Sequence, residues 1–140
     1  KVWQVSSGQP VGEDIQIVGG IGALALHRER EMLAIGLHSG EVHVLNYRRV
    51  DELLPDLKHP EAVISMNLNS DASILTVGDG YGYLHAWDLI NGRPKFPAQA
   101  HDGGILLVRQ PPGQDIVTSV SRNGELQLWN ARRSMMSTKA

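Results

Sequence analysis

The chain has 140 residues, a formal net charge of −2 and 41% hydrophobic residues, which is about one domain of globular sequence. It contains no cysteine, which excludes a disulfide framework, a thiolate zinc site and a thiol nucleophile. The near-neutral charge argues against nucleic-acid binding, and no apolar run approaches the roughly 18 residues of a membrane span. We therefore expect neither a nucleic acid nor a membrane as partner.

The predicted elements recur in the same order along the chain. Residues 1–5 read as the third strand of an earlier unit, and residues 11–18 as an outer strand beside it. Each later unit has an apolar strand, a polar turn, a second strand, a hairpin turn ending in Gly, and a third strand. The first strands are predicted at 21–27, 63–69 and 105–110, the second at 32–37, 74–79 and 116–121, and the third at 41–46, 83–88 and 125–130.

The segments between units supply candidates for a fourth strand. Pro55 and Pro97 lie inside these segments at equivalent positions. Because proline cannot donate a hydrogen bond to a neighbouring strand, the fourth strand is expected at the outer edge of its sheet.

An interval of 42 residues relates the units. It leads from Trp87 forward to Trp129, back to Leu45, and once more back to Trp3. The same interval joins the hairpin glycines Gly40, Gly82 and Gly124, and no insertion or deletion interrupts it between residues 1 and 133. The chain is therefore a repeat protein.

Four short antiparallel strands in about 40 residues, ending in a pair such as Trp87–Asp88 in "LHAWDLINGR", resemble the WD-repeat β-propeller family. The resemblance covers nearly the whole chain, and the repeats look like the regular, Gly-punctuated repeats of prokaryotic members. It implies an all-β fold of propeller blades with four antiparallel strands each. About three blades of a larger propeller are expected.

The repeat also predicts the domain organisation. A blade is apolar on both faces and cannot bury its core alone, and propellers close with about four blades or more. We therefore expect part of a longer propeller, with self-assembly into a ring as the alternative. Residues 1–20 would end a preceding blade with its outer strand, 21–62 and 63–104 would form WD-like repeats, 105–133 an incomplete repeat lacking its fourth strand, and 134–140 a polar tail.

The resemblance implies a polar set in each blade: His before the first strand, Ser or Thr in the second, Asp in the hairpin turn and Trp in the third. The last unit has Asn123 in place of the Asp, so the pairing of its His with an acid is expected to be weak. The middle unit retains only the His and the Trp, and the first unit retains none. The structural residues predicted in this way, with the residue after each Trp, are His59, His101, Ser119, Trp87, Trp129, Asp88 and Asn130.

Residue patterns that suggest chemistry have simpler explanations. His43 and His85 occupy matched strand positions, with Gln127 completing the row, but we expect no acid or Cys near them to build a zinc site. The Gly-rich stretch 77–85 lacks the Lys and Ser or Thr of a phosphate-binding loop. No paired carboxylates or activated nucleophile stand out. The sequence therefore predicts no catalytic residue, no metal and no cofactor.

One enzyme class remains as an alternative. Ala86, Asp88 and Gly92 partly match the tryptophan-docking pattern of quinoprotein propellers, with Phe96 where that pattern has Trp. A fragment of a quinoprotein-like propeller enzyme is therefore the second hypothesis.

The WD-repeat resemblance implies a non-catalytic scaffold for protein–protein interaction in a larger multidomain protein, and family analogy suggests a sensor module in signalling. In this family the turns before the first strand and after the second usually bind the partner. Tyr81 is the foremost candidate, because an aromatic replaces the expected Asp and interfaces favour Tyr, although it could simply shield the blade end. The candidates on this face are Tyr81, Asp79, Glu61, Asp102, Arg122 and Asn123. The lack of Cys and of a leader favours the cytoplasm.

Overall fold

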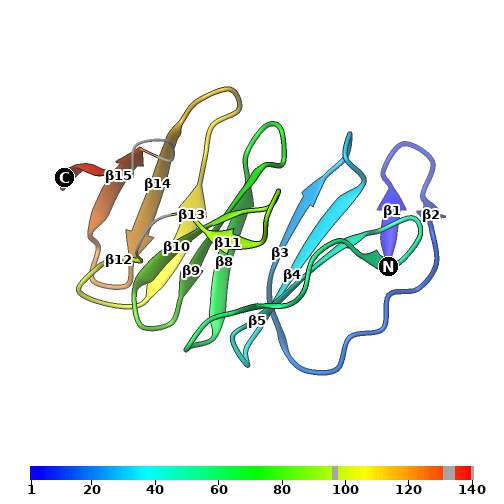
Figure 1. Cartoon of the computed structure of the whole chain (residues 1–140), viewed down its shortest axis with the longest axis horizontal. Helices are drawn as coiled ribbons and strands as arrows, with labels where there is room; N and C mark the ends of the chain where they lie inside the picture. The colour runs from blue at the N-terminus through cyan, green and yellow to red at the C-terminus, as the bar shows by residue number, and fades with distance from the viewer. Residues whose placement is uncertain (96–97, 131–134, 140) are drawn as a thin grey trace.

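The computed structural model describes residues 1–95, 98–130 and 135–139, and the described part is all-β. Its strands form four antiparallel sheets that stand side by side in chain order, from the N-terminal pair to the C-terminal sheet (Figure 1). The all-β fold of four-stranded propeller blades that the sequence predicts is confirmed. In this described part, no helix is long and apolar enough to span a membrane.

The N-terminal pair consists of β1 (Val2–Gln4) and β2 (Gln9–Val11). The second of these strands ends at Val11, where the sequence predicts that it begins. Gly12 follows with a φ of 74°, and a Cβ built on it would overlap the carbonyl oxygen of Tyr47, so this position favours glycine. Ile15 and Ile17 then pack against the apolar face of the next sheet without forming a strand.

The next two sheets follow the predicted repeat. In both, three consecutive strands pair in order and two short outer strands pair with the third of them. The first blade contains β3 (Ile21–His27), β4 (Met32–Leu37), β5 (Glu41–Asn46), β6 (Asp51–Glu52) and β7 (Leu57–Lys58). The second contains β8 (Val63–Leu68), β9 (Ile74–Asp79), β10 (Tyr83–Asp88), β11 (Arg93–Pro94) and β12 (Gln99–Ala100).

The fourth strand is outermost, as predicted, but it is split in two. In the first blade β6 pairs with the end of β5 and β7 with its beginning, and residues 53–56 lie between them. Pro55 falls in this gap because it has no N–H to offer β5. Pro97 lies outside the described residues.

The third blade has a fourth strand that the sequence analysis missed. Its strands are β13 (Ile105–Arg109), β14 (Ile116–Ser121), β15 (Leu126–Asn130) and β16 (Met135–Lys139). The segment 135–139 was expected in a polar tail, yet it pairs antiparallel with β15. The 42-residue period places it where the outer strand of the first blade lies, so the repeat continues beyond the point where its residue pattern fades.

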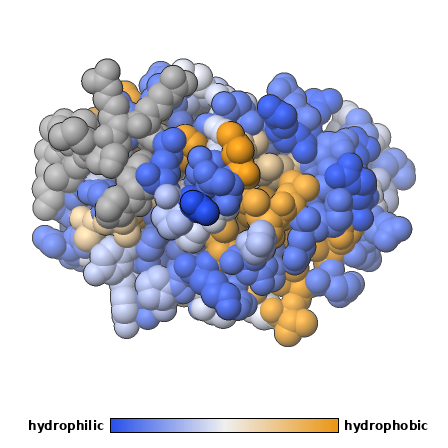
Figure 2. Space-filling model, viewed as in Figure 1, coloured by the Kyte–Doolittle hydropathy of each residue, from blue (hydrophilic) through white to orange (hydrophobic). Residues whose placement is uncertain are grey.

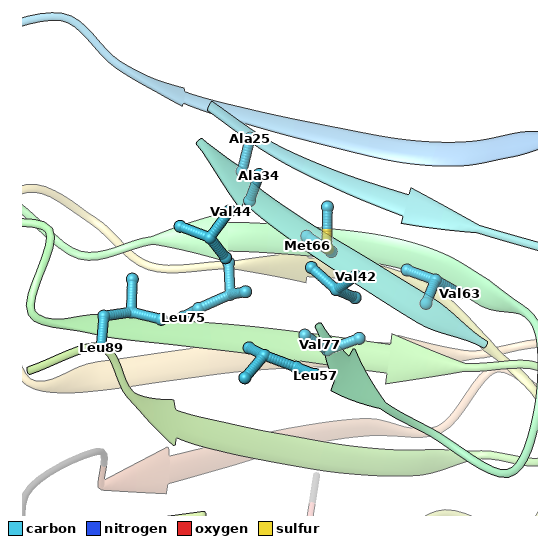
Figure 3. Packing of buried hydrophobic residues seen from close by; sticks show 10 residues of the cluster. All are labelled: Ala25, Ala34, Val42, Val44, Leu57, Val63, Met66, Leu75, Val77 and Leu89. Atoms are coloured by element: carbon cyan, nitrogen blue, oxygen red, sulfur yellow. The ribbon is translucent and has the colours of Figure 1, made fainter. Parts of the chain in front are cut away.

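The core lies between the blades. Val42 and Val44 of β5 share one face and pack in one cluster with Leu75 and Val77 of β9 and with Met66 of β8 (Figure 3). A smaller cluster joins the second and third blades in the same manner. The first strands also lie against one another, β3 beside β8 and β8 beside β13. Burial between neighbouring sheets is therefore what stabilises each blade.

Glycines at matched positions permit this close approach. A Cβ built on Gly36 of β4 would overlap the side chain of Val63, and one built on Gly78 of β9 would overlap that of Ile105. These two glycines are 42 residues apart, and each faces the first strand of the following blade.

One blade face is only partly covered. Leu24 of β3 is 59% exposed, whereas its repeat equivalents Met66 and Val108 are 4% and 0% exposed because a preceding blade covers them. A cavity of about 470 Å³ lies beside Leu24, lined by β1 and residues 15–17 on one side and by β3 and β4 on the other. Figure 2 shows apolar side chains gathered over the half of the molecule that holds β3 and β4.

Candidate partner-binding surface

The tip of the β9–β10 hairpin presents Tyr81 to solvent. The Tyr81 side chain is 66% exposed, while Asp79, two residues earlier, is fully buried. Asp79 Oδ1 accepts hydrogen bonds from the backbone N–H groups of Tyr81 (3.0 Å) and Tyr83 (2.9 Å). Asp79 thus organises the turn from within, and the expectation that it lies on the loop face beside Tyr81 is corrected.

A third contact completes the surroundings of Asp79. Its Oδ2 lies 3.1 Å from Nε2 of His85 on β10. Burial opposes the ionisation of Asp79, but the hydrogen bond from His85 and those from the two backbone N–H groups outweigh it. The pKa of Asp79 is therefore below its ordinary value, and the carboxylate stays charged inside the hairpin.

The hairpin tip rests on the loop that enters the third blade. Gly82, with a φ of 101°, accepts a 2.9 Å hydrogen bond from the N–H of His101 through its carbonyl. The N–H of Arg122 donates to the carbonyl of Gly104 at 2.8 Å, and the side-chain amide of Asn123 donates to the carbonyl of Asp102. These contacts join the turns of two blades into one surface.

The remaining candidates lie on this same end of the blades. Asp102, Arg122 and Asn123 are exposed, and Glu61 is half-buried beside the hairpin glycine of the first blade. Apart from Asp79, the predicted residues thus share one accessible face. We call this face, made of Glu61, Tyr81, Asp102, Arg122 and Asn123, the Tyr81 surface.

The second blade also holds a hydrogen-bonded His–Trp pair, in which His59 is buried and Trp87 is half-buried. Trp87 Nε1 donates a 2.9 Å hydrogen bond to His59 Nε2, and His59 Nδ1 lies 3.0 Å from the carbonyl of Gly40. The ring of His85 packs edge-on against His59, with centroids 4.7 Å apart. Burial, followed by the neighbouring His85, lowers the pKa of His59 to about 4. His59 is therefore neutral at pH 7, with its proton on Nδ1.

The third blade holds the fuller polar set. The buried hydroxyl of Ser119 lies 2.7 Å from Nε2 of His101 and accepts a 2.6 Å hydrogen bond from Nε1 of Trp129. His101 Nδ1 lies 3.1 Å from Oε2 of Glu125. The expectation that Asn123 leaves His101 weakly paired with an acid is wrong, because Glu125 provides the carboxylate from the strand side of the turn.

Each third strand has a polar residue directly after the position of Trp87 or its repeat equivalent. These residues stabilise turns at the end of the blades opposite the Tyr81 surface. Asp88 Oδ1 accepts a 2.8 Å hydrogen bond from the N–H of Ile90, and Asn46 Oδ1 accepts from the N–H groups of Arg48 and Arg49 at 3.0 Å. Asn130 ends β15 opposite Ile116. Phe96 of the tryptophan-docking pattern lies outside the described residues.

The surroundings of His43 and His85, which occupy matched strand positions, differ from the prediction. Both imidazoles have acids nearby: His85 lies beside Asp79, and His43 lies beside Glu52 and Asp56. The acids near His43 come from "DELLPD" at residues 51–56, where the split outer strand folds back on β5. Sequence spacing alone did not reveal them, because the pairing across strands decides which residues meet.

Comparison with known proteins supports the fold. No protein-family model matches the sequence. The chain is 28% identical over 115 residues to telomerase protein component 1 of Mus musculus, covering 81% of this chain and 4% of that protein. It is 31% identical over 96 residues to the WD repeat-containing protein 91 homolog of Dictyostelium discoideum, covering 68% of this chain and 12% of that protein. The chain thus spans a small part of the length of these relatives.

Among solved structures, the RRP9 WD40 repeats superpose on 89% of this chain and 39% of that chain, with a TM-score of 0.81 and 14% identity. This likeness shows the same fold. The 42-residue repeat, the four-stranded blades and these relatives lead to one conclusion: the chain belongs to the WD-repeat β-propeller family.

Proposed function

We propose that this chain is a non-catalytic protein-binding scaffold whose partner docks on the Tyr81 surface. The observation that carries the proposal is the large exposed fraction of Tyr81, 66%, on a turn whose backbone is held by a buried carboxylate. Tyrosine is enriched in interfaces because it offers a large, partly apolar contact area with a polar end.

The surface is preorganised. The Tyr81 turn is held from inside by Asp79 and from the side by the loop around Gly103 and Gly104. A partner that docks there orders few additional backbone groups, which lowers the entropic cost of association. This rigidity distinguishes the turn from an exposed aromatic on a loose loop.

The charged residues beside Tyr81 are suited to the polar rim of a protein–protein interface. Asp102 and Arg122 are both exposed and have opposite charges, so the surface favours a partner with an apolar anchor flanked by groups of both signs. A protein segment fits this description. The expected exclusion of nucleic acids and membranes, and the cytoplasmic location, stay predictions.

We also propose that further blades, from the same protein or from another chain, cover the open face of β3. The support is the contrast between Leu24 and its buried repeat equivalents, and the greater length of the curated relatives. Within such a larger multidomain protein, a sensor module of a signalling protein is the role that family analogy suggests. The partner would then be recognised by the Tyr81 surface of a closed propeller.

The experiment compares partner recovery by the full-length protein with and without Tyr81. In a quantitative pull-down, Tyr81→Ala is expected to lower the recovery of at least one protein about tenfold. Ile90→Ala is the matched control, because Ile90 is 82% exposed at the other end of β10. Equal recovery by wild type, Tyr81→Ala and Ile90→Ala would refute the proposed surface. The melting temperatures of all three should agree, since both side chains are exposed.

A further inference from the structure

One imidazole and two carboxylates, side chains of the types that ligate metals, meet at the outer edge of the first blade. His43 lies on β5, Glu52 at the end of β6 and Asp56 just before β7. His43 Nδ1 is 3.6 Å from Glu52 Oε1 and 2.7 Å from Asp56 Oδ1. One ligand atom from each of the three residues lies within 4.8 Å of the other two. This cluster is separate from the Tyr81 surface and from the His59–Trp87 pair.

The split outer strand builds the cluster. Leu45 pairs with Glu52 and Val42 with Leu57, and the N–H of Leu53 donates to the carbonyl of Val44 at 2.8 Å, so residues 54–56 form the extra length of chain beside His43. The His43 side chain is 16% exposed, and its Nδ1 is shielded from solvent without a hydrogen-bond partner. The short contact with Asp56 lacks the direction of a hydrogen bond. Nδ1 is thus a buried polar atom directed toward two carboxylates with no hydrogen bond of its own.

The repeat shows that the blade fold does not require this arrangement. The equivalents of His43, Glu52 and Asp56 in the second blade are His85, Pro94 and Ala98. That blade forms the same outer strands without either acid. Glu52 and Asp56 place two acidic side chains beside one imidazole, and a bound cation would interact favourably with all three.

We propose that His43, Glu52 and Asp56 bind a divalent transition-metal ion of the Zn²⁺ class. An imidazole nitrogen with two carboxylate oxygens is a donor set that Zn²⁺ accepts, whereas Mg²⁺ and Ca²⁺ prefer oxygen ligands alone. Tetrahedral coordination places ligand atoms about 3.3 Å apart, and the separations of 2.7 and 3.6 Å bracket that value. Glu52 and Asp56 are exposed enough to leave a position for water.

The ion would join both pieces of the outer strand to β5. Glu52 ends one piece and Asp56 precedes the other, and each piece has only two residues. Short outer strands have few hydrogen bonds to hold them, so a bridge from His43 would stabilise this edge of the sheet. The inference does not depend on the proposed partner surface.

The test is a titration of the metal-stripped 140-residue chain with ZnCl₂ by calorimetry. One saturable site is expected, and Zn²⁺ should raise the melting temperature. His43→Gln and Asp56→Ala should each weaken binding tenfold or more. Both substitutions copy residues that the repeat itself has at these positions, Gln127 and Ala98, so the blade is expected to fold. His38→Gln removes an exposed imidazole elsewhere and should leave binding unchanged.

The outcomes separate clearly. Absence of saturable Zn²⁺ binding by the wild type would overturn the proposal. Equal Zn²⁺ affinity of the wild type and Asp56→Ala would also overturn the proposal. Equal affinity of the wild type for Mg²⁺ and Zn²⁺ would overturn it too, because it would indicate only an acidic patch. If His43→Gln fails to fold by circular dichroism, the Asp56→Ala titration decides alone.

Discussion

Trp87 donates a hydrogen bond of 2.9 Å to Nε2 of His59, and this contact fixes the protonation state of a buried histidine. His59 Nδ1 is 3.0 Å from the carbonyl of Gly40, so both ring nitrogens are engaged when the ring is neutral. If Nε2 of His59 also carried a proton, that proton would face the indole N–H of Trp87, and the hydrogen bond between the two side chains would be lost. The pair therefore makes the stability of the second blade depend on pH.

We predict that the chain loses stability as the pH falls from about 6.5 to about 4. The pKa of His59 is 6.5 in the unfolded chain and about 4 in the folded one, so the unfolded state binds the proton more readily in this window. The stabilisation is complete above pH 6.5, and its loss by pH 4 amounts to about 3 kcal/mol. Urea unfolding at pH values from 7.5 down to 4 measures this loss.

The matched variant for this prediction is His59→Asn, which should be less stable at pH 7.5 but should lose less stability on acidification. A pH dependence identical to that of the wild type would assign the effect to other groups. The contribution of Asp79 is separable, because the pKa of Asp79 is lowered and its stabilisation is lost only as the pH falls below 3.8.

Ser119→Ala should destabilise the third blade by about 2–4 kcal/mol. Its hydroxyl accepts from Trp129 and contacts Nε2 of His101, and all of these atoms are buried. Removing the hydroxyl leaves Trp129 Nε1 and His101 Nε2 without a partner, at a cost of about 1–3 kcal/mol for each buried polar atom, although His101 keeps its contact with Glu125 through Nδ1. Ser39→Ala, on an exposed turn, should change the free energy of unfolding by less than about 0.5 kcal/mol. Equal effects of the two substitutions in urea would contradict the network.

Gly78→Ala should lower the free energy of unfolding by about 1–3 kcal/mol, because the new methyl group would overlap Ile105 in the next blade. Gly80→Ala is the control two residues away, since a Cβ there meets only the carbonyl of Ala62 at 3.8 Å. The control should be neutral or slightly stabilising, because alanine restricts the unfolded chain. Thermal denaturation of both variants distinguishes blade packing from a general effect on β9.

Asp79→Ala should destabilise the hairpin by about 2–4 kcal/mol, because the N–H groups of Tyr81 and Tyr83 and the ring of His85 lose their common acceptor. Amide hydrogen exchange should show faster exchange at Tyr81 and Tyr83 than in the wild type. Asp102→Ala, which removes an exposed carboxylate on the same surface, should leave exchange at these amides unchanged. Slow exchange that persists in Asp79→Ala would show that the turn is held by other contacts.

Strand positions and order could be predicted because they depend on local patterns. Six of the nine strands expected within the repeats have the predicted bounds, and Gly40, Gly82 and Gly124 adopt the positive φ that their hairpin turns require. Alternating apolar residues and turn glycines act over a few residues, and the 42-residue period repeats the same signal three times. The misplaced segments, 11–18 and 135–139, both lie where one copy of the pattern is weak.

Local residue patterns predicted the inner strands of each blade, its turns and the faces that must be covered. Which polar groups meet depends on pairing across strands and between blades, because that pairing brings together residues far apart in sequence. Burial of Asp79 under Tyr81, the pairing of Glu125 with His101 and the meeting of His43 with Asp56 all arise in this way. The spacing of residues along the chain predicts which side chains share one face of a strand. A site also depends on which strands lie side by side, and the spacing does not contain that information.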